Sequence, residues 1–367
     1  MSGGPVGVAL VGAGVISAEY LANLTAFPDV RVLAVADLDA ERAEAAAERH
    51  GVPASGDPAT VLAIPEVELV VNLTTPAAHA AVAFAALRAG KHVYGEKPLT
   101  LDPAEGRVLL AEAEERGLRI GNAPDTFLGA GLQSARRALQ AGVIGAPVAA
   151  TTVMQNPGPE SWHPSPEFLF QLGAGPLYDI GPYYLTALTA LLGPVARVAA
   201  TGRRARSSRV IGSGPKAGTV FGVEVPTHVT ALLDLESGPS VASTFGFDSP
   251  VRRIMVEITG TEGTLSVPDP NTFAGPLQVR GVKDEDWRDL PVTGTTVGRG
   301  LGVLEMARAL RAGVPHRASG AVALHVLETM AAIADSAETG EFRTVASTAP
   351  VPPELPADWD PHARTLG

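Results

Sequence analysis

The sequence has no cysteine among its 367 residues. It therefore forms no disulfide, offers no thiolate nucleophile, and cannot build a thiolate zinc or iron–sulfur site. No uninterrupted apolar run reaches the ~18 residues of a membrane helix, so we expect no membrane partner. The first five residues carry no basic charge, and the apolar run after them is too short for a secretory signal. We therefore expect a cytoplasmic protein.

Positive charge is scarce as well. Lys and Arg number 28 against 39 Asp and Glu, which gives a net charge of −11, so we expect no nucleic-acid partner. Only four of the 28 are lysines: Lys91, Lys97, Lys216 and Lys283. In a chain that otherwise uses Arg, a lysine is a candidate for a task that Arg cannot perform, such as giving up a proton. The sequence has no H-E-x-x-H, G-x-S-x-G or Walker motif, and we expect no bound metal.

The first 122 residues alternate between two periodicities. Short apolar runs predict strands at 6–11, 30–36, 69–73, 92–95 and 119–121. Helical patterns lie between them at 15–27, 39–50, 76–89 and 103–116, with Asp39 as a candidate N-cap. Strands that bracket helices require crossover connections, which predicts a doubly wound parallel sheet, an α/β fold.

The texture changes after residue 122. Helices are expected at 128–141 and 181–192, and strand patterns then follow one another at 195–202, 227–235, 240–247, 254–259, 263–267 and 277–279. Strands without intervening helices predict an α+β domain with a large open, mainly antiparallel sheet. Helices return at 299–312 and 320–339, and the Pro-rich tail should lack regular structure. The expected domains are 1–122 for dinucleotide binding, 123–348 for substrate binding and oligomerisation, and 349–367 as the tail.

A glycine turn joins the first predicted strand to the first helix. Gly12 permits a tight turn, and Gly14 lets the backbone approach a pyrophosphate at the helix N-terminus. Ser17 stands where a third glycine is usual. Asp37 ends the second strand, where a carboxylate can bind an adenosine ribose and repel a 2′-phosphate, or merely cap the next turn. No Arg or Ser adjoins it in sequence, so this Rossmann pattern predicts NAD rather than NADP.

Two further segments complete a family pattern. The first contains Thr74-Thr75-Pro76, with His79 shortly after, and leads to Glu96-Lys97-Pro98 at the end of a predicted strand. The second is the glycine-rich Asp179-Ile180-Gly181-Pro182-Tyr183. Together with the glycine turn, these motifs resemble the Gfo/Idh/MocA family of glucose–fructose oxidoreductase and inositol dehydrogenase. The motifs span residues 12–183, and the strand-rich remainder fits the family's second domain.

The resemblance implies roles for individual residues. Lys97 contacts the substrate hydroxyl, Asp179 anchors the sugar, and Tyr183 shuttles the proton where many members have His. A phenol, with a reference pKa of about 10, needs a neighbouring cation such as Lys97 to act as a base. By residue type rather than by the resemblance, Trp162 and His163 either bind substrate, by stacking on a sugar ring and hydrogen-bonding to it, or only pack within their loop. The cofactor-binding residues are Gly12, Gly14, Val15, Ile16, Asp37, Thr74, Thr75, Pro76, His79, Glu96 and Lys97.

Several alternatives stay open at this point. Glu96 could only orient its turn, His79 could position backbone or cofactor, and Tyr183 could belong to the core beside Tyr184. The residues His316, Arg317 and His325 could line the pocket or be structural.

We expect NAD-dependent hydride transfer at a secondary hydroxyl of a sugar, glycoside or cyclitol. The family implies a homodimer or homotetramer built through the C-terminal sheet. One rival is a redox-neutral enzyme that uses NAD to eliminate a substituent from a sugar. The other is a non-catalytic dinucleotide-sensing regulator, against which the retained Glu96-Lys97-Pro98 motif speaks.

Overall fold

The structure is a computed structural model that describes residues 3–367, and its backbone divides into two compact units. Unit 1 takes the described chain up to Ala130 together with Gly294–Leu324 and Pro352–Gly367. Unit 2 takes Gly131–Thr293 and His325–Val351. The predicted domain boundaries after residues 122 and 348 stay a prediction. Within the described chain, no helix has the length and apolar character needed to cross a membrane.

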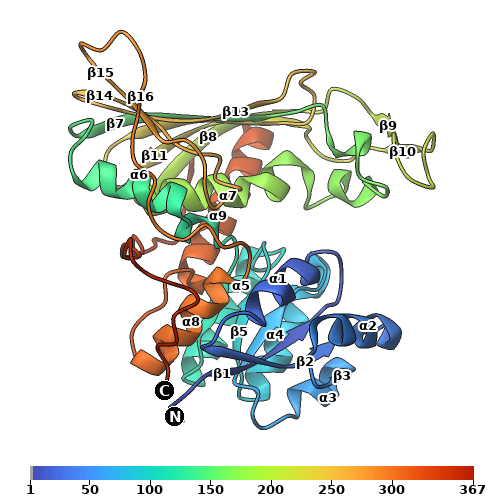
Figure 1. Ribbon diagram of the computed structural model, residues 1–367. Coiled ribbons are helices and arrows are strands. Elements are labelled where there is room, and N and C mark those ends of the chain that lie inside the picture. The colour runs from blue at the N-terminus through green and yellow to red at the C-terminus, as the bar shows by residue number, and fades with distance from the viewer. Residues whose placement is uncertain (1–2) are drawn as a thin grey trace. The chain divides into compact units, whose positions relative to one another are not determined.

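Unit 1 contains a sheet of six parallel strands in the order β3-β2-β1-β4-β5-β6 (Figure 1). The strands are β1 (Val6–Val11), β2 (Val30–Ala36), β3 (Ser55–Gly56), β4 (Leu69–Asn72), β5 (His92–Gly95) and β6 (Ile120–Asn122). The helices are α1 (Ser17–Leu24), α2 (Ala40–His50), α3 (Pro58–Leu62), α4 (His79–Arg88), α5 (Pro103–Glu115) and α8 (Leu301–Ala312). Every residue of β1 is buried, as expected of a central parallel strand with both faces covered.

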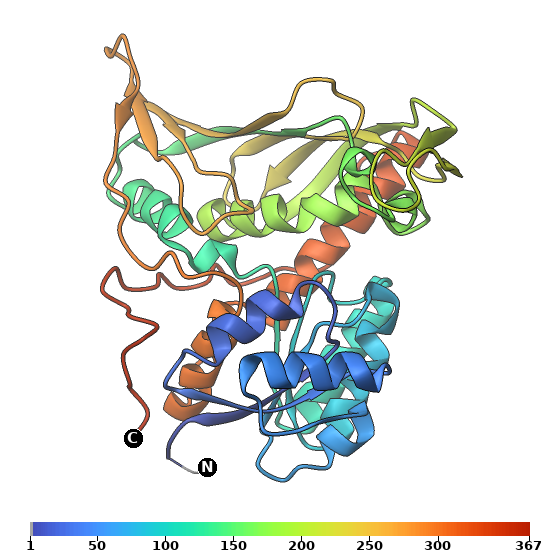
Figure 2. The ribbon, with the colours of Figure 1, turned by 45° about the vertical axis from the view of Figure 1, so that its right-hand side comes forward.

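The strand order reverses between β1 and β4. From β1 the chain moves outward to β2, and from β4 it moves outward in the opposite direction to β5. Right-handed crossovers therefore place helices on both faces of the sheet. Figure 2 shows α1 and α2, in blue, side by side on one of them. The predicted doubly wound parallel sheet is confirmed, and the two-residue β3 and the short α3 are the elements that the sequence patterns missed.

Unit 2 contains a sheet of nine strands in the order β16-β15-β14-β13-β7-β12-β11-β8-β17. The strands are β7 (Pro147–Gln155), β8 (Val195–Arg203), β11 (His228–Leu235), β12 (Ser240–Gly246), β13 (Arg253–Gly260), β14 (Gly263–Ser266), β15 (Gln278–Gly281), β16 (Arg288–Asp289) and β17 (Arg343–Thr344). Only β7 and β12 pair in parallel, which confirms a mainly antiparallel sheet. A separate hairpin pairs β9 (Ser208–Val210) with β10 (Val220–Gly222).

Helices cover one face of this sheet. Figure 1 shows α6 (Ala130–Gln140), α7 (Gly175–Leu192) and the long α9 (Gly320–Thr339) on the same side of it. The burial of β11 alternates accordingly: Val229, Ala231 and Leu233 are buried, whereas Leu232 between them is 56% exposed. The opposite face is therefore open to solvent over β11, and its use in an oligomer stays a prediction.

Helix α7 begins six residues earlier than expected. The sequence patterns placed its start at Gly181, but the helix begins at Gly175 and carries Pro182 inside it. Pro176 is tolerated because the first N–H groups of a helix have no intrahelical partner. Asp179 and Tyr183 consequently lie four residues apart on one continuous helix, and so on the same face of it.

The C-terminal tail has no helix or strand after residue 348, as predicted, but it is firmly docked within unit 1. The buried carboxylate of Asp29 accepts hydrogen bonds from the backbone N–H groups of Thr365 and Leu366 and from the Thr365 hydroxyl. Arg308 in α8 donates to Asp29 at 2.8 Å and to the carbonyl oxygens of Asp360 and Ala363. One ion pair thus anchors the last residues of the chain.

Removing the Asp29 carboxylate should destabilise the protein strongly. In an Asp29→Ala variant, Arg308 and two tail N–H groups lose their buried acceptor. A broken buried pair costs about 3–5 kcal/mol. Urea unfolding of the wild type and the variant measures this difference. Asp234→Ala is the matched control, because the Arg197–Asp234 pair is 57% and 40% exposed and should contribute less than about 1 kcal/mol.

The stability difference between the wild type and Asp29→Ala should also depend on pH. Burial raises the pKa of Asp29, but the hydrogen bonds from Thr365, Leu366 and Arg308 outweigh it and hold that pKa below its usual value. A lowered pKa means that the stabilisation is complete above the unfolded-state pKa of about 4 and is lost as pH falls through the lower folded value. The difference between wild type and Asp29→Ala should therefore shrink under acidic conditions, and a difference that stays constant down to pH 2 contradicts this account.

Candidate functional site

The turn between β1 and α1 is fixed by close backbone approach. Gly12 has φ 103°, and its N–H donates to the Ala36 carbonyl at 2.8 Å. A Cβ on Gly12 would lie 2.6 Å from the carbonyl carbon of Leu73, at the end of β4. Ser17, in place of the third glycine, is buried, and its hydroxyl donates to the Gly14 carbonyl at 2.6 Å. No side chain caps α1, so its N-terminus remains available to an anion.

Asp37 connects the end of β2 to the glycine turn. Its Oδ2 accepts the N–H of Ala13 at 2.7 Å, and its Oδ1 accepts the N–H of Asp39 at 2.9 Å. Asp39, rather than Asp37, caps α2, because it accepts the N–H of Arg42 at 3.2 Å. The carboxylate of Asp37 therefore lies beside the glycine turn, and its contact with a ribose stays a prediction.

A cavity of about 340 Å³ opens beside this turn. Its lining includes Val15 and Leu38, whose apolar side chains are 100% and 94% exposed. A Cβ added to Gly14 would meet no atom within 4 Å. Apolar walls around a few polar groups suit a ligand with aromatic faces, and the residues present therefore fit an adenine dinucleotide. The lining is Val11, Gly12, Gly14, Val15, Ile16, Asp37, Leu38, Arg42, Pro58, Leu73, Thr74, Thr75, Ala78 and Val82.

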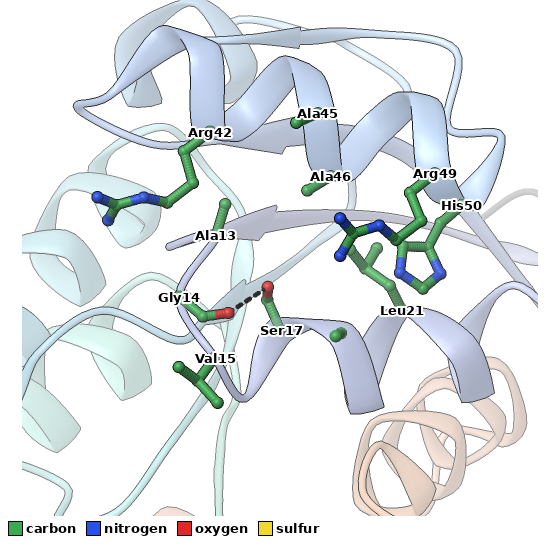
Figure 3. A pocket seen from close by; sticks show the side chains of 11 residues that line it. Ala13, Gly14, Val15, Ser17, Leu21, Arg42, Ala45, Ala46, Arg49 and His50 are labelled. Carbon is green, nitrogen blue, oxygen red and sulfur yellow. Dashed lines mark hydrogen bonds between the residues drawn. The ribbon is translucent and has the colours of Figure 1, made fainter. Parts of the chain in front are cut away.

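A second cavity of about 410 Å³ lies between α1 and α2 (Figure 3). Arg42, Arg49 and His50 line it from α2, and the close-up shows them across from Gly14 and Ser17. Arg42 lines both cavities and lies 4.0 Å from Asp37. The sequence analysis found no Arg adjacent to Asp37. The first turn of α2 brings one near it, and the three-residue spacing from the N-cap Asp39 is the signal that could have found it.

Glu96 ties the lysine segment to α1. Its Oε1 accepts a hydrogen bond from the Tyr20 hydroxyl at 2.8 Å, and its Oε2 accepts the N–H of Lys97 at 3.0 Å. Burial and the nearby Glu96 charge raise the pKa of Tyr20, which keeps the phenol protonated as the donor. Lys97 is half-buried and lies two residues after the end of β5, at the carboxyl edge of the sheet. Glu96 thus orients the turn that presents Lys97.

His79 connects the ends of β4 and β5. Its Nδ1 lies 2.6 Å from the Pro98 carbonyl, and its Nε2 lies 3.1 Å from the Thr74 carbonyl. Burial lowers the pKa of His79, so the ring is neutral near pH 7 and has one N–H, which we assign to the shorter contact. Asn72 completes the link: its amide group donates to the His79 carbonyl at 2.9 Å and accepts from the Thr74 hydroxyl at 2.7 Å. Contact of His79 with a cofactor stays a prediction.

A third acid at this edge escaped the sequence analysis. Asp125 is fully buried just after β6 and accepts the N–H groups of Gly300 and Gly302, both at 3.0 Å, at the start of α8. Burial raises the pKa of Asp125 to about 6, and the Glu96 charge contributes to the shift. Its position three residues after a strand is the only local signal.

Unit 2 carries the remaining predicted site residues. On α7, Tyr184 packs edge-on against Phe245 of β12 with ring centroids 5.9 Å apart, so Tyr184 faces the sheet. Adjacent helix positions point about 100° apart, and Tyr183 therefore points in another direction, on the face that it shares with the half-buried Asp179. Trp162 is 67% exposed in the loop before α7.

Three residues with open roles are structural. His325 is fully buried: its Nε2 accepts the Val195 N–H at 2.9 Å, and its Nδ1 lies 3.0 Å from the Ser347 carbonyl. His316 lies 3.0 Å from the Ile120 carbonyl, and Arg317 pairs with Glu305 at 2.7 Å. Within residues 3–367, no group of three or more His, Asp or Glu side chains could hold a metal ion.

The structure thus brings one group of predicted residues together in unit 1: the glycine turn, Asp37, the Thr74–Pro76 segment and the Lys97 turn lie along the carboxyl edge of one sheet. A second group, consisting of Trp162, His163, Asp179 and Tyr183, belongs to unit 2. Joint action of the two groups on one substrate stays a prediction.

Comparisons with known proteins cover both units. Residues 6–123 match the oxidoreductase family with an NAD-binding Rossmann fold, and residues 132–266 match the GFO/IDH/MocA C-terminal domain. Inositol 2-dehydrogenase 1 of Saccharopolyspora erythraea is 30% identical over 271 residues, which are 73% of this chain and 75% of that protein. Trans-1,2-dihydrobenzene-1,2-diol dehydrogenase of Bos taurus is 28% identical over 281 residues, which are 75% of this chain and 78% of that protein.

Solved structures agree in fold. An NAD binding oxidoreductase from Klebsiella pneumoniae has a TM-score of 0.83 at 22% identity and covers 94% of this chain and 100% of its own. Levoglucosan dehydrogenase in complex with NADH and levoglucosan has a TM-score of 0.79 at 22% identity, with 93% and 99% covered. The motifs, the two folds and these relatives agree: the chain belongs to the Gfo/Idh/MocA family of oxidoreductases with an NAD-binding Rossmann domain.

Proposed function

We propose that the protein catalyses reversible hydride transfer between NAD and a secondary hydroxyl of a sugar, glycoside or cyclitol. One observation carries the proposal: Glu96 joins the Lys97 turn to α1, and His79, whose carbonyl is bound by Asn72 at the end of β4, donates to the Pro98 carbonyl of that turn. The relatives named inositol dehydrogenase and dihydrodiol dehydrogenase support a substrate with a hydroxyl on a ring carbon.

The cofactor is held by unit 1 in this proposal. The N-terminus of α1 and the Gly12–Ile16 turn hold the pyrophosphate, and Asp37 accepts hydrogen bonds from the adenosine ribose. Val15 and Leu38 lose their solvent exposure against the dinucleotide. NAD, when bound, supplies the hydride acceptor for the reaction.

In this proposal, side chains accept the proton of the substrate hydroxyl and stabilise the negative charge that develops on its oxygen. Lys97 Nζ stabilises the negative charge that develops on the substrate oxygen, and the Tyr183 hydroxyl oxygen takes the proton. Asp179 accepts a hydrogen bond from a neighbouring hydroxyl and so fixes the orientation of the ring. The ammonium charge of Lys97 is also what would let a phenol act as a base near neutral pH.

The assembly and the location belong to the same proposal. The open face of the sheet of unit 2, on which Leu232 is 56% exposed, supports a homodimer or homotetramer formed through this sheet. A reaction that draws on the NAD pool of the cell supports a cytoplasmic location.

A panel of sugars, inositols and glycosides tests the proposed function. Each compound is mixed with the protein and NAD, and NADH is followed by its absorbance, with Lys97→Ala as the inactive control. NADH formation from at least one ring compound is expected. Release of a leaving group without net NADH identifies redox-neutral elimination instead, and NAD binding with no chemistry on any compound identifies a dinucleotide sensor.

The protein should prefer NAD to NADP at least about tenfold, because Asp37 would meet a 2′-phosphate with like charge. In an Asp37→Ser variant, the difference between the NADH and NADPH affinities should become smaller, since the nearby Arg42 can then pair with the 2′-phosphate. Fluorescence titration with NADH and NADPH measures both affinities. Adding Arg42→Ala to Asp37→Ser should remove the increase in NADPH affinity. If the wild type binds NADPH more tightly than NADH, the role of Asp37 is contradicted.

Lys97 and Tyr183 should act as one catalytic pair. Lys97→Ala and Tyr183→Phe should each lower kcat by about 10²–10⁴, the usual size of a general acid–base contribution. The double variant should be little worse than the poorer single variant, because the residues share one step. Lys97→Arg should also fail, since a guanidinium keeps its proton and has a planar shape.

NADH affinity is the control for Tyr183→Phe, and it should barely change because the proposed role of Tyr183 concerns the substrate. Full activity of Tyr183→Phe on a compound that the wild type oxidises would show that Tyr183 is structural. The proton must then leave through Lys97 or His163.

A further inference from the structure

A short loop of unit 2 holds three aromatic rings in a row. We name residues 156–168 the aromatic loop. The Trp162 and His163 ring centroids are 5.5 Å apart, and those of His163 and Phe168 are also 5.5 Å apart, both pairs edge-to-face. Trp162 is 67% exposed and Phe168 is 51% exposed. Rings left this exposed add little to folding, so their fixed arrangement calls for another explanation.

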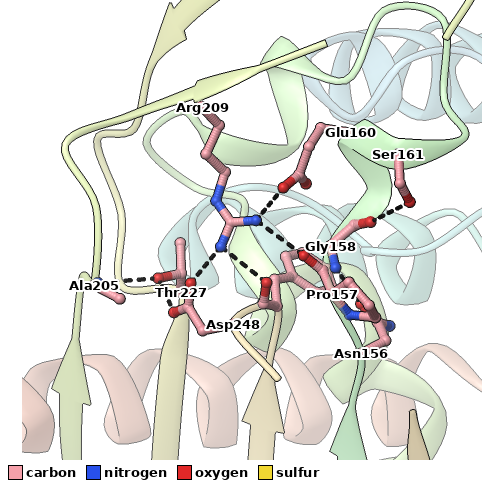
Figure 4. Close-up of polar contacts among 10 residues, drawn as sticks. Asn156, Pro157, Gly158, Glu160, Ser161, Ala205, Arg209, Thr227 and Asp248 are labelled. Atoms are coloured by element: carbon pink, nitrogen blue, oxygen red, sulfur yellow. Dashed lines mark hydrogen bonds and ion pairs between the residues drawn. The ribbon is translucent and has the colours of Figure 1, made fainter. Parts of the chain in front are cut away.

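The backbone of the loop is fixed by Arg209 of β9, whose side chain is only 2% exposed and whose guanidinium lies beside Pro157 and Glu160 (Figure 4). One terminal nitrogen donates to the Pro157 carbonyl at 3.1 Å and pairs with the Glu160 carboxylate. The other donates to the Phe247 carbonyl at 2.8 Å and pairs with the Asp248 carboxylate. Arg209 therefore joins the aromatic loop to the segment that follows β12.

Backbone contacts connect the segment that Arg209 binds to the residues that carry the rings. Gly158 has φ 109°, and a Cβ there would overlap the carboxylate of Glu160 and the guanidinium of Arg209. The Pro159 carbonyl accepts the N–H groups of Trp162 at 3.1 Å and His163 at 2.8 Å. The backbone positions of Trp162 and His163 are thus fixed by the segment that Arg209 binds.

The buried cluster of Arg209, Glu160 and Asp248 contributes little net stability for the free energy that its burial costs. Two carboxylates and one guanidinium are taken largely out of water, and such clusters are often no more stable than apolar side chains of the same volume. What a buried cluster of this kind can supply is a single backbone conformation. A loop that is fixed before binding loses less entropy when it binds.

The ring of His163, which contacts the other two rings, adds a hydrogen-bonding group to the aromatic loop. His163 Nδ1 accepts the N–H of Ser165 at 3.0 Å. The neutral ring therefore carries its proton on Nε2, which is its hydrogen-bond donor. An N–H donor between two aromatic rings matches a ligand with a face of C–H groups and a rim of hydroxyl oxygens. An apolar protein surface laid on the same rings would leave that donor unpaired.

We propose that Arg209, through Glu160 and Asp248, holds the aromatic loop as a preformed binding surface for a carbohydrate ring. Trp162 and Phe168 contact the C–H face of the ring, and His163 Nε2 donates to one of its oxygens. Arg209 is a positioning residue that does not touch the ligand. This inference rests on the proposed function and assigns the part of unit 2 that contacts the ring of its substrate, since an open-chain polyol presents no continuous C–H face.

Direct binding tests the surface without any need for turnover. The NAD-loaded protein is titrated with methyl glucopyranoside, myo-inositol and the open-chain polyol glucitol, and tryptophan fluorescence and calorimetry are followed. A cyclic compound should bind and change the fluorescence, and glucitol should bind at least about tenfold more weakly. Trp162→Phe should keep the binding but lose the fluorescence change, and Trp162→Ala should weaken the binding about tenfold.

The role of Arg209 is tested by Arg209→Lys, which keeps the charge but cannot pair with both carboxylates at once. This variant should weaken binding of the cyclic compound about as much as Trp162→Ala. On a compound that is oxidised, it should raise KM and leave kcat unchanged. Glu160→Gln, which keeps the shape of the partner, is the second variant if Arg209→Lys does not fold. Trp287→Phe, at a 37% exposed tryptophan elsewhere in unit 2, should change none of these quantities.

The outcomes separate this inference from the proposed function. Binding of a cyclic compound that depends on Trp162, without NADH formation from any compound, supports the surface and overturns the proposed reaction. NADH formation with a KM that neither Trp162→Ala nor Arg209→Lys changes overturns the surface and leaves the reaction standing. Equal binding of glucitol and the cyclic compounds, or no binding of any of them, also overturns the surface.

Discussion

The close approach of Gly12 to the end of β4 is the constraint on which the dinucleotide site depends. A side chain at Gly12 would collide with the backbone of Leu73 and Thr74, so only glycine allows β1 and β4 to end side by side. This is also the point at which the strand order reverses, where open α/β sheets bind their ligands. The cavity, the position of Asp37 beside the turn and the link through His79 all follow from this arrangement.

In both units, polar side chains with little exposure fix the segments that carry proposed site residues. In unit 1, Glu96 and His79 fix the turn that presents Lys97, while Asp29 anchors the chain's last residues. In unit 2, Arg209 fixes the loop that presents Trp162. Most polar atoms of these groups bind backbone groups or oppositely charged partners, which limits the cost of removing them from water. Rigid support of this kind is what precise orientation of a reacting hydroxyl requires.

Local patterns in the sequence were enough for most of the fold. The apolar runs of β1 and β2 coincide with the strands, and the N-cap Asp39 marks the start of α2. The early start of α7 was missed, although a helix tolerates proline in its first turn, where Pro176 lies. The β9–β10 hairpin was missed because its strands have three residues each. Contacts distant in sequence leave no local pattern, and the Arg209 cluster joins residues 157, 160, 209 and 248.

Amide hydrogen exchange with and without NADH tests the central claim most directly, because it reports where the dinucleotide binds. The account predicts slower exchange in three segments of unit 1 when NADH is added: the glycine turn at 12–18, the end of β2 at 37–39, and the segment 74–79 after β4. Exchange around the aromatic loop should change little without a sugar ring. Protection confined to other segments, or no protection at saturating NADH, would contradict the assignment of this edge of the sheet as the cofactor site.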